Sequence, residues 1–373
     1  MKSLGPRFDV AVTLAVALAG GALGTTLNLP IGWLLGSAIA VTTASLAGLN
    51  TRLPNGLRTV TFFVLGVQAG AGVTPDVAGQ LAVWPLSFAI QMIGVAGVVA
   101  VTYVFLRKGF GWDNETALFA SLPGAMGFVL AAASQTRTDM ARIVIVQSVR
   151  LLLLLGALTP TLAWLQGGGG AGAAIARGGH PGTLAEYGLL LGTCVAGSIL
   201  GALAKVPGGM MLGALIGSAV MHVTGLAEVV IPLWISTPAL TVLGAVIGSR
   251  IRPEHRRDLV QMAPAALGAF AIGLLISGIA GFVAHLLLAI DFGKLALAYA
   301  PGALEALTVL AFQFDLDPAY VASHHVVRFV CIALLVPFLA RRVSAVKLEP
   351  EKVVDWRSDD AGSGVDRGKD GGR

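Results

Sequence analysis

Two similar stretches of the chain carry ionisable side chains within otherwise apolar sequence. The later one, APGALEALTVLAFQFDLDPAYVASHHVVRFV, begins at residue 300 and contains Glu305, His325 and Arg328. Charged groups are costly within a membrane, so their presence there usually marks a path for an ion or a substrate. A guanidinium binds anions, whereas a carboxylate or an imidazole can take up and release a proton. This pattern predicts a site for a small anion and a coupling ion.

The earlier stretch, SLPGAMGFVLAAASQTRTDMARIVIVQSVR, contains Gln147 and Arg150. These two residues are three apart, as are His325 and Arg328, so on a helix each pair shares one face and can converge on one bound group. One structural alternative pairs Arg328 with Glu305 and Arg150 with backbone carbonyls, which would lock the helices together. Another has both arginines reaching the membrane surface. For His325, a hydrogen-bonded packing role is the alternative.

Helix breakers precede the polar residues in both stretches, as Pro123-Gly124 and Pro301-Gly302. Proline removes a backbone donor and glycine adopts dihedral angles that other residues avoid, so a continuous helix is not expected. Unpaired backbone groups at membrane depth need protein or a watery cavity beside them, and a helix that starts after a break directs N–H groups into that cavity. A simple kink is the alternative, but two equivalent breaks would meet near the centre. We therefore expect Gly124 and Gly302 to contact the substrate.

Three acidic residues have different expected roles. Glu305 stands where the earlier stretch has Gly127, so the two stretches are chemically unequal, and this carboxylate is the first candidate for ion coupling, with His325 second. Asp317 is followed by Pro318, which is typical of a helix N-cap with proline at the first helical position. We expect Asp139 and Asp317 to cap helices at the edge of the site.

The composition places these stretches in a polytopic membrane protein. Of 373 residues, 55% are hydrophobic and 12% are charged, and the mean hydropathy is +0.82. Such a chain has too little polar surface for a soluble globule, and the fold class we expect is all-α. The net charge of +5 reflects basic residues that lie in short loops between apolar runs, so it does not indicate a nucleic-acid partner.

The chain also contains an internal duplication. Apolar runs of roughly spanning length occur near residues 9–27, 31–49, 57–74, 80–106, 117–134 and 142–165, and again near 184–204, 208–227, 234–250, 259–289, 295–312 and 319–340. Residues of the two sets match at an offset of 177, as for Pro30 and Pro207, and then of 178, as for Arg150 and Arg328. Conservation of turn formers and buried polar residues over so long a match indicates two structural repeats.

The distribution of basic residues indicates how the repeats are oriented. If all twelve runs cross, seven basic residues lie outside and ten inside. If the fifth run of each half returns to its own face, 15 lie inside and only Arg177 and Lys294 outside. The positive-inside rule favours the second arrangement. We therefore expect two inverted repeats, each with about five transmembrane helices and one broken or re-entrant segment, as in many secondary transporters.

These features predict the division of the chain and its location. We expect a first membrane repeat at 1–166, a Gly-rich linker at 167–183, a second repeat at 184–343 and a disordered charged cytosolic tail at 344–373. The first apolar run is expected to be a retained helix and not a signal peptide. The expected location is the bacterial inner membrane, with both termini in the cytoplasm.

Motifs for other chemistry are not found in the sequence. The sequence has no phosphate-binding loop with a Lys-Ser/Thr end, no paired-Cys zinc spacing and no Gly-x-Ser-x-Gly motif. Cys194 and Cys331 lie in separate apolar runs, and the six histidines are scattered. We therefore expect no catalytic residues, no metal and no cofactor.

The chain resembles the duplicated AbrB membrane-protein family, whose labels include an ammonia monooxygenase and a transcriptional regulator. The resemblance covers residues 10–342 and rests on LPIGWLLGSAIA and VPGGMMLGALIG, and on LPGAMG…TDMARIVIVQSVR and APGALEAL…LDPAYVASHHVVRFV. The family's second-half motif is carried over to Pro301, Gly302, Glu305, Asp317, His325 and Arg328. This chain departs from that motif, because Ala303 and Ala306 replace its third Gly and its Met.

The functional expectation is a secondary transporter of a small anionic solute, working by alternating access between the inverted halves. Arg150 and Arg328 would hold the anion with Gln147, Gly124 and Gly302, and Glu305 and His325 would couple a proton or sodium ion. The expected partners are the solute, the ion and the lipid bilayer, with oligomerisation left open. The alternatives are a membrane sensor that affects gene expression and, third, a monooxygenase component, which would need a clustered metal site.

Overall fold

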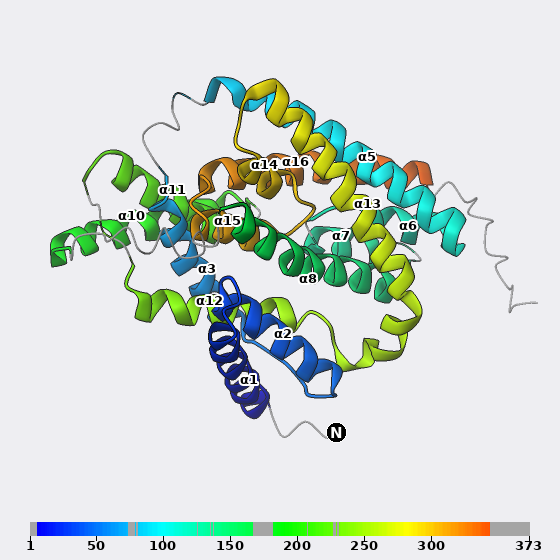
Figure 1. Cartoon of the computed structure of the whole chain (residues 1–373), viewed down its shortest axis with the longest axis horizontal. Helices are drawn as coiled ribbons and strands as arrows, with labels where there is room; N and C mark the ends of the chain where they lie inside the picture. The colour runs from blue at the N-terminus through cyan, green and yellow to red at the C-terminus, as the bar shows by residue number, and fades with distance from the viewer. Residues whose placement is uncertain are drawn as a thin grey trace, which may run out of the picture.

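A computed structural model describes residues 6–73, 81–124, 126–134, 138–166, 182–206, 208–226 and 231–343, together with Gly79, Thr136 and Val229. Every regular element in these ranges is a helix (Figure 1). Most of the expected linker at 167–183 and the whole expected tail at 344–373 lie outside the described residues.

The described helices form two series in chain order. The first contains α1 (Pro6–Thr26), α2 (Gly32–Leu46), α3 (Asn55–Gly70), the 3₁₀ turn η1 (Leu81–Val83), α5 (Trp84–Phe110), α6 (Asn114–Ser121), α7 (Met126–Ala133) and α8 (Met140–Leu165). The second contains α10 (Leu184–Leu203), α11 (Gly209–Val223), α12 (Leu233–Gly248), η2 (Pro253–His255), α13 (Arg256–Leu288), α14 (Phe292–Tyr299), α15 (Leu304–Gln313) and α16 (Pro318–Val343).

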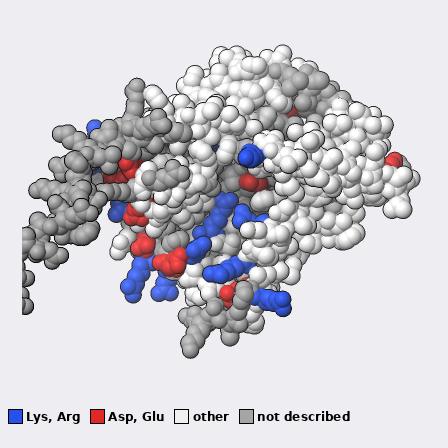
Figure 2. Space-filling model, turned by 180° about the vertical axis from the view of Figure 1, so that it is seen from behind, with Lys and Arg blue, Asp and Glu red and all other residues white. Residues whose placement is uncertain are grey.

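Six of the described helices are long and apolar enough to cross a membrane, namely α1, α5, α8, α10, α13 and α16. This finding supports a membrane protein. The four helices α2, α3, α11 and α12 have 15 or 16 residues, which corresponds to about 22–24 Å at 1.5 Å per residue. Much of the described surface in Figure 2 is uncharged, and several Lys and Arg side chains lie in and around a hollow.

The sequence offset recurs between the elements. Helices α2 and α11 begin 177 residues apart, whereas α3 and α12, α6 and α14, and α7 and α15 each begin 178 residues apart. Helix α2 packs against α12 and α3 packs against α11, so helices of the first half pair with helices of the second. The folded structure is therefore intertwined and does not consist of two side-by-side halves.

Packing divides the described helices into two units. The six-helix unit comprises α1–α3 and α10–α12, and the eight-helix unit comprises α5–α8 and α13–α16. Glycines allow close packing in the six-helix unit, because a Cβ on Gly36 would collide with the carbonyl oxygen of Gly20, and one on Gly213 with that of Gly197. Contacts between the units are fewer than those within them and run through α2, α3 and α12 on one side and α8, α15 and α16 on the other. They include one buried hydrophobic cluster that contains Leu34 and Leu65 as well as Leu151 and Leu310.

Candidate functional site

Both Pro-Gly dipeptides interrupt a helix. Helix α6 ends at Ser121 before the first dipeptide and α7 begins at Met126, and the equivalent break separates α14 from α15. Gly124 has a φ of 81°, which favours glycine. A Cβ on Gly124 would lie 3.1 Å from Nη2 of Arg328 and 3.4 Å from the carbonyl oxygen of Gly302. The two breaks therefore meet inside the protein.

The two buried arginines donate to carbonyl groups at the breaks. Arg150 Nη2 donates to the carbonyl oxygen of Leu122 at 3.0 Å. Arg328 donates from Nη1 to Ala300 at 2.6 Å and from Nη2 to Gly302 at 2.8 Å. Both side chains are at most 4% exposed. These contacts show how two cations are tolerated at this depth, and they leave the remaining guanidinium N–H groups directed elsewhere.

The residues three positions before the arginines make equivalent contacts. Gln147 Nε2 donates to the carbonyl oxygen of Phe119 at 3.3 Å, and His325 Nε2 lies 3.2 Å from that of Leu297. The other ring nitrogen of His325, Nδ1, is buried and has no hydrogen-bond partner among the described residues. The packing role considered for this histidine is thus present on one side of the ring only.

The aspartates lie at helix starts. Asp139 accepts from the backbone N–H groups of Ala141 at 3.1 Å and Arg142 at 3.2 Å, and so caps α8. Asp317 accepts from Tyr320 N at 3.1 Å and forms an ion pair with Lys294 at 2.7 Å. Neither aspartate lines the cavity described next.

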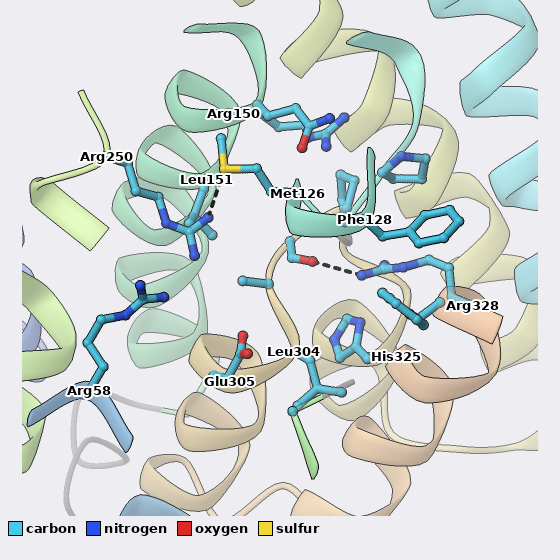
Figure 3. A pocket seen from close by; sticks show the side chains of 18 residues that line it. Arg58, Met126, Phe128, Arg150, Leu151, Arg250, Leu304, Glu305, His325 and Arg328 are labelled. Atoms are coloured by element: carbon cyan, nitrogen blue, oxygen red, sulfur yellow. Dashed lines mark hydrogen bonds between the residues drawn. The ribbon is translucent and has the colours of Figure 1, made fainter. Parts of the chain in front are cut away.

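One cavity of about 310 Å³ joins the two breaks. Figure 3 shows its side chains converging from several helices. The sequence-predicted residues that line it are Gln147, Arg150, His325, Arg328, Gly124, Gly302 and Glu305. The fold therefore brings together seven of the nine predicted site residues, from positions about 180 apart in the chain.

Two further arginines line the same cavity, and sequence reasoning missed them as site residues. Arg58 belongs to α3, and Arg250 follows α12, so both come from the six-helix unit. Arg250 Nη1 lies 3.8 Å from the sulfur of Met126. The repeat gave no signal for either residue, because the equivalent positions are Ser236 and Gly72. Their role follows only from the way α3 and α12 pack beside the breaks.

Glu305 provides the only carboxylate among the described residues that line the cavity. It lies in the first turn of α15, and no ion pair joins it to Arg328 within the described residues. Its charge acts on Arg250: burial lowers the pKa of that guanidinium, Glu305 raises it and Arg58 lowers it further. In Figure 3, Arg58, Arg250 and Glu305 are directed toward the same space.

Metal-ligating groups do not gather in the described part of the chain. No cluster of three or more His, Cys, Asp or Glu side chains there is placed to hold a metal ion. Cys194 and Cys331 are both unpaired thiols on different helices. The cavity itself is lined by guanidinium groups and by residues at helix starts, which are kinds of groups that bind anions in proteins.

Comparison with known proteins identifies relatives over most of the chain. A family model described as "Transition state regulatory protein AbrB" matches residues 33–344. The chain is 25% identical over 343 residues to "Putative regulator AbrB" of Escherichia coli (strain K12), covering 91% of the chain and 97% of the relative. It is 23% identical over 359 residues to "Uncharacterized protein YhjN" of Bacillus subtilis (strain 168), covering 87% of the chain and 91% of the relative. No solved structure matches.

Proposed function

The chain belongs to the AbrB family, and we propose that it is a secondary transporter of a small anion. The observation that carries the proposal is the cavity in which both helix breaks and both buried arginines meet. Interrupted helices and buried cations at the centre of a membrane protein are costly, and transporters use both to bind anionic substrates. Arg150, Arg328, Gln147, Gly124 and Gly302 would contact the substrate.

Contacts along the broken segments support their return to the face from which they enter. In the first half, Asp139 N donates to Thr116 Oγ1 at 3.0 Å, and further along, Arg150 reaches Leu122. Helix α8 thus runs beside α6 in the same direction. Equivalent contacts link Lys294 to Asp317 and Ala300 to Arg328. If α6 and α8 start at the same face, the segment between them must turn back.

A second contact supports inverted repeats. Ser45 Oγ donates to the carbonyl oxygen of Ile251 at a buried site, and one cavity is lined by residues of both 50–53 and 249–254. Twelve crossings would put these two loops on opposite faces, whereas five crossings per half put both in the cytoplasm with the two termini. We therefore propose two inverted repeats in the bacterial inner membrane.

Alternating access then follows from the two packing units. Each unit contains helices of both halves, and the cavity lies where the units meet, with Arg58 and Arg250 on one side and the breaks on the other. We infer that the six-helix and eight-helix units, and not the two sequence halves, move against each other. Glu305 and His325 would couple the movement to a proton or sodium ion.

Uptake by proteoliposomes tests this function. The purified full-length protein would be reconstituted and assayed with radiolabelled sulfate, phosphate, succinate and acetate under imposed proton and sodium gradients. We expect gradient-driven uptake of at least one anion, its loss in Arg328→Gln, and uptake without gradient dependence in Glu305→Gln. Uptake by both variants at the rate of the parent would contradict the proposal.

The printed name of the Escherichia coli relative favours a second candidate, a membrane regulator of gene expression. Deletion of residues 344–373 distinguishes the regulator from the transporter. A regulator that signals through this segment would lose a transcriptional response and keep uptake, whereas we expect a transporter to keep uptake and to affect transcription only through its solute.

A further inference from the structure

The cavity contains more cationic groups than a singly charged anion needs. Four guanidiniums line it, from Arg58, Arg150, Arg250 and Arg328, against the single carboxylate of Glu305 within the described lining. Resting on the transport function proposed above, we propose that the substrate is a small dianion that bridges the two packing units. One charge would meet Arg150 and Arg328 on the eight-helix unit, and the other would meet Arg58 and Arg250 on the six-helix unit.

The two pairs of arginines differ in how their charges are compensated. The guanidiniums of the eight-helix unit donate to three backbone carbonyls in total, those of Leu122, Ala300 and Gly302. Arg250 contacts only the weak sulfur acceptor of Met126 among the described atoms. Because each pair belongs to a different unit, a monoanion bound by one pair leaves the other pair facing Glu305 alone. A dianion compensates both.

The position of the second pair also favours contact with the substrate. A further cavity of about 530 Å³ shares Arg58, Met126 and Arg250 with the central cavity and is lined by Arg252 as well. Figure 2 shows Lys and Arg side chains gathered in a hollow of the surface. An anion that enters through this second cavity passes Arg58 and Arg250 before it reaches Arg150 and Arg328. Such a row of guanidiniums raises the local concentration of anions.

The helix ends are consistent with a second charge site beside the first. The break residues before α7 and α15 line the cavity, as do Met126 and Leu304, with which the two helices begin. Ala303, the N-cap of α15, provides no side-chain hydrogen bond to the first turn. Free N–H groups in the first turn of a helix bind anions. The dianion therefore has donors on several sides of a cavity whose volume admits only a small molecule.

Charge selectivity tests the proposal on the purified full-length protein. Thermal unfolding would be measured against two pairs of anions of similar size, succinate with butyrate and sulfate with nitrate, because a ligand that binds the folded state raises its stability. We expect at least one dianion to act at a concentration about tenfold or more below that of its monovalent partner, a preference of about 1.4 kcal/mol. Arg250→Gln and Arg58→Gln should remove this preference and leave the monoanion response within about threefold.

Three variants complete the experiment. Arg107→Gln is the control, because Arg107 lies in the last turn of α5 and lines neither cavity; it should keep the preference for dianions. Arg250→Lys retains the charge and should restore most of that preference. Arg328→Gln should weaken the response to dianions and monoanions alike.

The possible outcomes separate the two proposals. Equal responses to monoanions and dianions, or the same behaviour for Arg250→Gln and Arg107→Gln, would overturn the dianion assignment while uptake of an anion still supported transport. Failure of all four anions to stabilise the protein, together with no uptake of any anion, would overturn both. Arg250→Gln could instead keep the preference for dianions and lose only the effect that Glu305→Gln has on uptake. Arg250 would then be a counter-ion of that carboxylate, and the dianion assignment would be wrong.

Discussion

At the scale of single residues, the two buried arginines have unequal structural roles. Arg328 donates two hydrogen bonds and Arg150 donates one. Each loss leaves one carbonyl without a donor, because Ala300 O also accepts from Gly302 N at 2.8 Å. Loss of Arg328 removes one more hydrogen bond from a charged group, which contributes about 1.5–3 kcal/mol. We therefore expect Arg328→Ala to lower the unfolding temperature further than Arg150→Ala. Thermal unfolding of both variants in the same detergent would measure this, and an equal or reversed order would contradict the observed hydrogen bonds.

Gly124 combines two constraints that substitution can separate. Its φ of 81° disfavours any side chain, and its Cβ position faces Nη2 of Arg328. Gly48 has a φ of 103° but open space around the same position, so Gly48→Ala is a matched control for the backbone cost alone, about 1–2 kcal/mol. We expect Gly124→Ala to lower the free energy of unfolding by this amount. We also expect it to weaken anion binding, because the added Cβ displaces the Arg328 guanidinium. Thermal unfolding with and without sulfate would show both effects.

If sulfate stabilised Gly124→Ala as much as the parent protein, Gly124 would not be part of the anion-binding site. Gly302 provides a contrast, because the atoms nearest to a Cβ there belong to the side chains of Leu154 and Leu307. These side chains can move, so Gly302→Ala should affect stability through packing and leave Arg328 in place.

The sequence identified the buried arginines and Glu305 because each interrupts an apolar run. It identified neither Arg58 nor Arg250 as a site residue, since both lie close to the ends of apolar helices, where basic residues are ordinary topology signals. Only the packing of α3 and α12 against the breaks turns them toward the cavity. The sequence also did not predict the carbonyl partners of Arg328, because the break places the carbonyls of Ala300 and Gly302 within hydrogen-bond distance of the guanidinium, whereas the carboxylate of Glu305 forms no ion pair with it among the described residues.

At the scale of elements, the apolar runs predicted the helices better than their ends. Proline and glycine specified the interruptions at residues 123–124 and 301–302, where α6 and α14 stop. The sequence expects α3 near 57–74 and the structure has it at Asn55–Gly70. Ends are harder to predict because the last turns of a helix fray and packing against neighbouring helices decides the boundary.

The broken segments lead to a prediction about loop exposure. Single cysteines at Asn50, Ser134 and Glu254, in a protein that lacks Cys194 and Cys331, would be labelled with a membrane-impermeant thiol reagent. If each fifth segment turns back, all three positions face the cytoplasm and react in inverted vesicles but not in intact spheroplasts. Asp315→Cys is the control, because it lies after the second broken segment and should react only in spheroplasts.

Twelve crossings give a different labelling pattern. Ser134 and Glu254 would then react from outside together with Asp315, and Asn50 alone would react from inside. That result would remove the inverted repeats from the proposed mechanism, whereas the shared cavity of the two breaks would still need an explanation.

At the scale of the whole molecule, the described helices exchange partners between the sequence halves. Gly66 of α3 approaches Ala214 of α11, and Gly94 of α5 approaches Ala280 of α13, where a Cβ on each glycine would lie 3.0 and 2.8 Å from the alanine Cβ. Contacts this close join the halves within each packing unit. Movement of one half against the other would have to break both interfaces, whereas movement of the units repacks the fewer contacts between them, including the hydrophobic cluster that they share.

Distance measurements between spin labels distinguish these movements without a known substrate. Labels would replace the exposed residues Leu23 of α1, Leu203 of α10, Ile93 of α5 and Leu286 of α13 in the full-length protein, in lipid nanodiscs. We expect narrow distributions for Leu23 with Leu203 and for Ile93 with Leu286, because each pair lies within one unit. The pairs Leu23 with Ile93 and Leu203 with Leu286 join different units and should show two or more distances, which the imposed pH or an added anion shifts. Narrow distributions within each half and broad ones between halves would show that the repeats move as bodies, and the assignment of the cavity to a moving boundary between the two units would then be wrong.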